Sequence, residues 1–153
     1  MPPPTRAEQF EPLPPERAGL WSNFLSWPGR TFFPNVVGLL LEEIRNDYAR
    51  LRLPYREELQ QPAGVVHGGA IATMIDTVVV PAVASPYDAV PRMLTLTMNV
   101  QYVGAVVEED AVAEGWIVRR GRSTVFCRAE VQTESGALAA TGELVYTVRP
   151  NPA

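Results

Sequence analysis

The sequence GVVHGGAIATMIDTVVV, residues 64–80, places the only histidine of the chain directly before two glycines and then sets an aspartate within an apolar run. The run continues to Ala84, and a stretch of this length is too long for a typical strand. Apolar side chains on nearly all sides suit a helix that is wrapped by a curved sheet. The stretch therefore predicts a long buried helix over residues 68–84, with Pro81 bending or loosening its last turn.

Alternating apolar and polar residues, typical of half-buried strands, flank this helix on both sides. A strand over residues 37–45 that turns at Asn46-Asp47 is expected to form a hairpin with a strand over residues 48–53. Further alternating segments follow the helix, over residues 94–102, 111–119, 124–132 and 138–148. The predicted order is two strands, the helix and four strands, which indicates an α+β domain over residues 35–150.

The first 34 residues differ in composition from this domain. Prolines concentrated within residues 1–15 predict an extended or disordered arm outside the core. A short amphipathic helix over about residues 16–27 should follow and dock on the main domain. One face of this helix carries Leu20, Trp21, Phe24 and Leu25.

Charge and composition exclude several classes of function. The chain has 13 basic and 17 acidic residues, a net charge of −4, and so lacks the basic excess of a nucleic-acid binder. No apolar stretch reaches the roughly 20 residues of a membrane span. The single cysteine, Cys127, cannot form an internal disulfide, and the first residues lack the pattern of a secretory signal. We expect a cytoplasmic protein that binds neither nucleic acid nor membrane.

The start of the predicted helix carries a candidate catalytic group. Free backbone N–H groups favour negative charge there, and glycine leaves the Gly68 amide unobstructed to stabilise an oxyanion. Asp76 lies nine residues after His67, about 13 Å along the axis and half a turn away. If both serve one reaction, the simplest arrangement is a two-fold dimer in which each carboxylate faces a glycine amide of the other chain. Burial among apolar neighbours would leave Asp76 poorly hydrated, as suits a general base or a nucleophile.

Structural roles are open for the same residues. Asp76 can cap a neighbouring loop, His67 can pair with a backbone carbonyl, and Gly68-Gly69 can form a tight turn. A metal site is not expected, because one histidine, one cysteine and the acidic residues show no ligand spacing. A serine or cysteine triad is not expected either, since no serine lies in a Gly-x-Ser-x-Gly motif.

The segment Gly64 to Gly69, with Asp76 nine residues after the histidine, resembles the hotdog-fold acyl-CoA thioesterases of the PaaI (phenylacetyl-CoA thioesterase) type, in the 4-hydroxybenzoyl-CoA thioesterase superfamily. The similarity covers about residues 37–148, and residues 98–102 look like that family's third strand. It implies a long helix wrapped by an antiparallel sheet. It also implies a homodimer whose sheets join edge to edge, with two active sites at the interface, and leaves a further pairing into tetramers open.

The resemblance implies roles for individual residues. Gly68 would polarise the thioester carbonyl, Asp76 of the partner subunit would activate water or attack directly, and His67 would orient the loop or the thioester. The family often has Asn six residues before the histidine, where this chain has Gln61, one methylene longer. Thr95 falls where a hydroxyl residue often helps to place the water, or is simply a polar residue on a strand face.

Substrate binding is assigned on the same basis. Gly69 belongs to the glycine pair, and three guanidinium groups in one turn either contact the phosphates of CoA or form a solvated loop. This turn is Arg119-Arg120-Gly121-Arg122-Ser123. Aromatic residues near the N-terminus either pack onto the sheet or reach a neighbouring acyl tunnel: Trp21, Phe24, Phe32 and Phe33.

Three hypotheses on function follow. The first is an acyl-CoA thioesterase that hydrolyses the thioester to a carboxylic acid and CoA, without metal or redox cofactor. The second is a non-catalytic acyl-CoA-binding or sensing module, which the intact Asp76 counts against and Gln61 slightly favours. The third is an enoyl-CoA hydratase, which is weaker because fold-mates with that activity pair Asp with His in a different motif.

Overall fold

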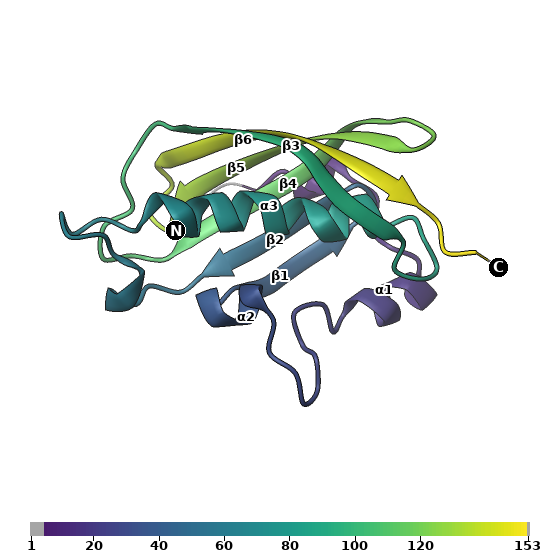
Figure 1. Ribbon diagram of the computed structural model, residues 1–153, viewed down its shortest axis with the longest axis horizontal. Helices are drawn as coiled ribbons and strands as arrows, with labels where there is room; N and C mark the ends of the chain where they lie inside the picture. Colours follow the sequence, from purple (N-terminus) through teal and green to yellow (C-terminus); the bar gives the residue numbers. More distant parts are fainter. Residues whose placement is uncertain (1–4, 153) are drawn as a thin grey trace.

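The computed structural model describes residues 5–152 and shows an antiparallel sheet curved around a long helix (Figure 1). This helix, α3 (Gly68–Ala84), has the bounds that the sequence predicted. The sheet has six strands in the order β1-β2-β4-β5-β6-β3. Their bounds are Leu40–Arg45 (β1), Tyr48–Leu53 (β2), Arg92–Tyr102 (β3), Ala111–Arg120 (β4), Thr124–Thr133 (β5) and Leu138–Arg149 (β6). The expected α+β architecture, a central helix wrapped by an antiparallel sheet, is confirmed.

Helix α3 is buried because two glycines let the sheet approach it closely. A Cβ built on Gly115 of β4 would lie 2.8 Å from Cγ1 of Val78, and one on Gly142 of β6 would overlap Cγ2 of Ile75. Val78 and Ile75 are themselves fully buried. Any larger residue at either glycine would push the helix away from the strands that position its side chains.

Strand β3 forms one edge of the sheet and contains a bulge. Its pairing with β6 shifts register between Thr95 and Thr97. Thr95 pairs with Tyr146, and Met98 pairs with the buried Leu144, so both face α3 although their spacing is odd. The unbroken alternation expected over residues 94–102, which put Thr95 and Met98 on opposite faces, is therefore wrong.

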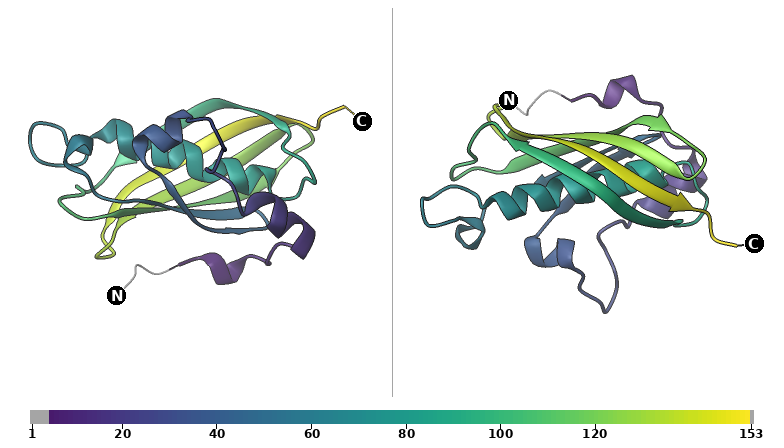
Figure 2. Two further views of the ribbon diagram at one scale, coloured as in Figure 1. Left: turned by 90° about the horizontal axis from the view of Figure 1, so that it is seen from below. Right: turned by 45° about the horizontal axis from the view of Figure 1, so that its top comes forward.

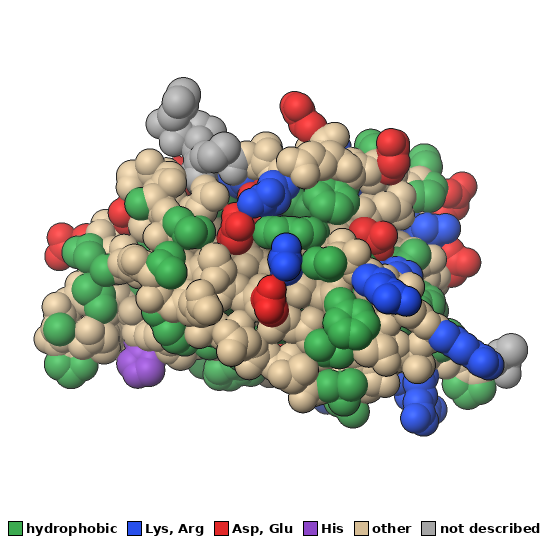
Figure 3. All heavy atoms as spheres, turned by 90° about the horizontal axis from the view of Figure 1, so that it is seen from above, with side chains coloured by type: hydrophobic (Ala, Val, Ile, Leu, Met, Phe, Trp, Pro, Cys, Tyr) green, Lys and Arg blue, Asp and Glu red, His purple; other side chains and the backbone are tan. Residues whose placement is uncertain are grey.

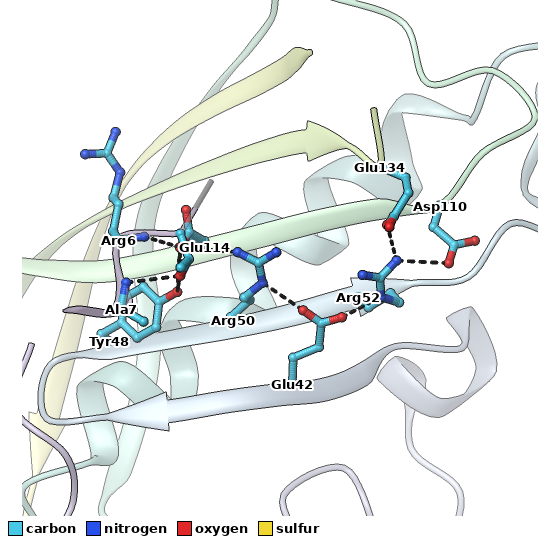
Figure 4. Close-up of polar contacts among 10 residues, drawn as sticks. Arg6, Ala7, Glu42, Tyr48, Arg50, Arg52, Asp110, Glu114 and Glu134 are labelled. Atoms are coloured by element: carbon cyan, nitrogen blue, oxygen red, sulfur yellow. Dashed lines mark hydrogen bonds and ion pairs between the residues drawn. The ribbon is translucent and has the colours of Figure 1, made fainter. Parts of the chain in front are cut away.

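The face of the sheet opposite to α3 carries a chain of charged side chains on β2 and β4 (Figure 4). Arg50 donates from Nε to Glu42 at 2.7 Å, and the Tyr48 hydroxyl donates to Glu114 at 2.5 Å. Burial, with Glu114 adding to it, holds the pKa of the Tyr48 phenol well above its ordinary value, so this proton stays in place. Arg52 contacts the carboxylates of Glu42, Asp110 and Glu134.

The N-terminal arm is ordered from Thr5 onward, so the disordered alternative is wrong for these residues, and it packs on this charged face, outside the hydrophobic core around α3. The backbone N–H of Arg6 and the hydroxyl of Thr5 donate to Glu114 at 2.7 and 3.0 Å. Phe10 stacks on Tyr48 with ring centroids 5.1 Å apart. Figure 2 shows this segment on the side of the sheet away from α3. The buried Glu114 carboxylate explains the order, because the arm supplies donors that it needs. Residues 1–4 lie outside the described residues.

The segment between the arm and β1 also departs from prediction. Helix α1 (Pro15–Trp21) ends six residues before the predicted end, and Leu25 adopts a φ of 71°, which a right-handed helix does not allow. A second short helix, α2 (Phe33–Val37), was not predicted. It ends at Gly38, where φ is 93°, so β1 begins at Leu40 and not at residue 37.

We expect Gly115→Ala to lower the free energy of unfolding by about 1–3 kcal/mol, because its Cβ would meet Val78 and displace α3. Urea denaturation measures the change. Gly19→Ala is the matched control: it lies within α1, no atom lies within 4 Å of the new Cβ, and it should be neutral or slightly stabilising. Equal stability of the two variants would contradict the packing described here.

Candidate active site

The N-terminus of α3 presents one backbone amide that no side chain occupies. His67 is the N-cap residue, and its Nδ1 accepts a hydrogen bond from the Gly69 N–H at 2.8 Å. The Ala70 N–H bonds to the His67 carbonyl at 2.9 Å. Within residues 5–152 the Gly68 N–H makes no hydrogen bond. The histidine thus satisfies Gly69 and leaves Gly68 as the free donor at the positive end of the helix dipole.

Two neighbouring rings explain why both positions are glycine. A Cβ on Gly69 would lie 3.0 Å from Nδ1 of His67, and a Cβ on Gly68 would lie 3.3 Å from the Tyr102 ring. The Tyr102 hydroxyl also donates to the Gly68 carbonyl at 2.8 Å. The sequence placed Tyr102 on a strand only; in the structure it fixes the first turn of α3. The tight-turn alternative for Gly68-Gly69 is wrong, because both residues belong to the helix.

Asp76 lies midway along α3, with its carboxylate held by two neighbouring strands. Oδ1 accepts from Thr95 Oγ1 of β3 at 2.9 Å and from the Tyr146 hydroxyl of β6 at 2.7 Å. The Thr95 contact agrees with the expectation that this hydroxyl lies near the carboxylate. The apolar run had suggested that Asp76 is enclosed, but in the single chain its side chain is only half-buried.

Sequence reasoning missed Tyr146. The residue is 3% exposed, and burial, with the nearby Asp76 carboxylate adding to it, raises the pKa of its phenol well above the ordinary value. The phenol therefore remains a donor to Asp76. An inward-facing tyrosine needs a partner for its hydroxyl, which was the available signal, but the partner could be found only once the register of β3 and β6 was known.

Within one chain the free amide and the carboxylate do not meet. Gly68 and Asp76 are eight residues apart on a continuous helix, which separates them by about 12 Å along its axis. A carbonyl oxygen hydrogen-bonded to Gly68 is therefore out of reach of Asp76 of the same chain. The expected site shared by two chains stays a prediction.

Gln61 lies near Gly68 but is used partly by its own turn. Its Oε1 accepts from the Ala63 N–H at 2.7 Å, and its backbone N–H donates to the Val65 carbonyl at 2.8 Å. Gln61, Gly68 and Tyr102 line a hollow of about 380 Å³. The turn occupies Oε1 of Gln61 and leaves the amide nitrogen of this side chain available.

The arginines of the turn between β4 and β5 differ in their contacts. Arg120 donates to the Val83 carbonyl at 3.0 Å and to Asp47 at 2.6 Å, so its guanidinium caps the C-terminus of α3. The expectation that Arg120 binds substrate is therefore corrected, because its donors are engaged at the helix end. Arg119, Arg122 and Ser123 remain exposed. The turn lies at the end of α3 opposite to Gly68, roughly 22 Å away along the helix.

The N-terminal aromatic residues pack mainly among themselves. Trp21 is 4% exposed, Phe24 packs edge-on against Trp27 at 6.0 Å, and Trp27 against Phe32 at 4.9 Å. These contacts favour packing over a role in an acyl tunnel. Phe33 is the exception, at 64% exposure.

Two features of the described residues concern metal sites and membrane spans. Within residues 5–152, no three or more His, Cys, Asp and Glu side chains are grouped so that they could hold a metal ion. None of the helices in the same residues is both long enough and apolar enough to span a bilayer.

Comparisons with known proteins identify the family. The family model described as Thioesterase superfamily matches residues 63–140. A curated protein of Halobacterium salinarum, named "Putative esterase", is 33% identical over 104 residues, which are 65% of this chain and 68% of that protein. The PaaI protein from the phenylacetic acid degradation operon of E. coli has a TM-score of 0.76 at 12% identity, over 86% of this chain and 94% of that chain.

A hypothetical thioesterase of Streptococcus pneumoniae, solved with coenzyme A, has a TM-score of 0.69 at 18% identity, over 76% of this chain and 89% of that chain. The two solved structures share the fold of this chain, a long helix within a curved antiparallel sheet. The hotdog fold implied by the motif is thereby confirmed, and the chain belongs to the thioesterase superfamily.

Proposed function

We propose that the protein is an acyl-CoA thioesterase whose active site combines Gly68 of one chain with Asp76 of another. The observation that carries the proposal is the pair of prepared groups on α3. One is an amide without an acceptor at its N-terminus, and the other is a carboxylate midway along it with one oxygen held by two donors. Amide donors and a carboxylate are the groups that thioester hydrolysis requires.

The second chain is proposed to approach through β3. This strand is one edge of the sheet, so its outer backbone groups are unpaired within the described chain. The strand carries exposed apolar side chains, with Leu94 at 70% and Leu96 at 60% exposure. Thr95, which holds Asp76, and Tyr102, which holds Gly68, lie toward opposite ends of β3. Antiparallel pairing of two β3 strands would therefore bring the Thr95 end of one strand beside the Tyr102 end of the other, and with them Asp76 of one chain and Gly68 of its partner.

The proposed reaction uses water as its only co-reactant. Water adds to the thioester carbonyl carbon while Asp76 takes its proton, and the resulting oxyanion accepts a hydrogen bond from the partner subunit's Gly68. Collapse of this intermediate breaks the C–S bond, and the CoA thiolate takes the proton from the Asp76 carboxyl. Direct attack by the carboxylate, with water hydrolysing the anhydride, gives the same acid and thiol. His67 holds the loop so that the Gly68 amide stays free.

The phosphate-bearing end of the substrate is proposed to bind arginines at the start of β3. The side chains of four arginines make no hydrogen bond, ion pair or aromatic contact within residues 5–152: Arg92, Arg119, Arg122 and Arg149. Arg92 pairs directly with Arg149 across β3 and β6, and the Ser123 carbonyl bonds to the Val148 N–H, so these residues share one end of the sheet. Like charges placed opposite one another are unfavourable unless an anion lies between them.

This end of the sheet is close to Asp76 and far from His67. Arg92 is three residues from Thr95 along β3, roughly 10 Å. In Figure 3 the basic side chains gather toward the end where the chain finishes, while the histidine lies at the other end. The Streptococcus pneumoniae structure with coenzyme A supports a nucleotide-bearing thioester as the substrate class.

Replacing Asp76 by Asn should lower kcat for acyl-CoA hydrolysis by at least about a thousandfold, because the amide can neither accept the proton nor attack. Release of free thiol from a panel of aromatic and aliphatic acyl-CoA thioesters measures it. Thr97→Val, on the same strand but outside the site, is the control and should retain activity. Turnover by Asp76→Asn at the wild-type rate would refute the assignment. Tight binding without thiol release by the wild-type protein would favour a sensing module instead.

The double replacement of Arg92 and Arg149 by Gln should raise KM for acyl-CoA by about tenfold and leave kcat unchanged. Hydrolysis of the matching acyl-pantetheine, which lacks the nucleotide, should not respond. Arg128→Gln, which removes the ion pair with Glu143 on the outer face, is the control. An equal loss with both thioesters would show that the two arginines do not bind the nucleotide.

A further inference from the structure

Tyr146 is a buried titratable residue beside Asp76 that the proposed reaction leaves without a role. Its hydroxyl lies 2.7 Å from Oδ1 of Asp76 and 2.9 Å from the backbone oxygen of the same residue. Both acceptors belong to Asp76, so the Tyr146 phenol holds the Asp76 carboxylate close to the backbone of α3. The ring is 3% exposed and has no room to swing away.

The two donors on the carboxylate converge on one oxygen. Thr95 and Tyr146 both bond Oδ1, and they are direct partners in the pairing of β3 with β6. Oδ2 accepts no hydrogen bond from any of residues 5–152. Rotation of the carboxylate about its Cβ–Cγ bond would break both bonds to Oδ1. The free lone pairs of this group are therefore those of Oδ2.

We propose that Tyr146 is a positioning residue that, together with Thr95, fixes the Asp76 carboxylate through Oδ1 and makes Oδ2 the oxygen that meets water or the thioester carbon. This inference rests on the function proposed above. A carboxylate locked in this way needs no reorientation during the reaction, which is the advantage of a preorganised site. Tyr146 donates its proton throughout and exchanges none with the substrate.

The orientation of the Asp76 carboxylate depends on the hydroxyls of Thr95 and Tyr146. Asp76 forms no ion pair within residues 5–152, and its polar neighbours there are Thr95 from β3 and Tyr146 from β6. Removing the phenol would leave Oδ1 with one donor and let the carboxylate turn.

The test compares Tyr146→Phe with Tyr48→Phe. Each change removes one hydroxyl from a buried tyrosine that donates to a carboxylate, but Tyr48 bonds Glu114 on the opposite face of the sheet. Tyr146→Phe should lower kcat by about 10- to 100-fold, the value of a hydrogen bond to a charged group, with KM unchanged. Tyr48→Phe should lower thermal stability and leave kcat unchanged.

The outcomes separate this inference from the proposed function. If Asp76→Asn is inactive while Tyr146→Phe keeps the wild-type kcat, the thioesterase assignment stands and the positioning role is wrong. A wild-type protein without hydrolysis would end the assignment itself. If Tyr146→Phe does not fold, Thr95→Val on the edge strand β3 removes the other donor to Oδ1. Its kcat should fall by about 10- to 100-fold with KM unchanged, and a wild-type kcat would overturn the inference.

Discussion

The site depends on a fixed spacing along one rigid helix. Gly68 and Asp76 lie about 12 Å apart on α3, and the sheet grips this helix so closely that a Cβ on Gly115 would collide with Val78. Neither group can move toward the other without unpacking the core. The proposed reaction can therefore use both groups only if a second copy of the chain supplies one of them.

The packing around this helix also prepares each group for its role. At one end the His67 imidazole occupies the Gly69 amide and leaves Gly68 free. At the other, adjacent strands place two hydroxyls on one oxygen of Asp76. At the first end Tyr102 of β3 also holds the Gly68 carbonyl, and at the second the two hydroxyls belong to β3 and β6. The same contacts that stabilise the fold thus determine which donor and which acceptor remain available to a substrate.

The sequence predicted the elements whose signal is local, and it missed contacts that depend on register or on long-range partners. Periodicity predicted the bounds of α3 and the order of the strands along the chain. Motif spacing indicated the Gly68 amide and the Asp76 carboxylate as candidate groups. The bulge at Thr95 reverses the faces of β3, so Tyr146 could not be paired with Asp76 in advance. The arm is ordered by its contacts with Glu114, which is distant in sequence. Arg120 likewise caps the end of α3, which lies far from it along the chain.

A mixed dimer tests the central claim most directly. Gly68→Pro deletes the amide; the first helical position and the extended ψ of 135° at His67 suit proline, and the exposed Tyr102 ring, 3.3 Å from the new Cβ, has to shift by a few tenths of an ångström. Chains carrying Gly68→Pro or Asp76→Asn should each be inactive alone. Mixed chains whose exchange is verified by native mass spectrometry should recover about a quarter of wild-type activity, since half the dimers hold one complete site. Exchanged mixtures that stay as inactive as their parents would contradict a site shared between two chains.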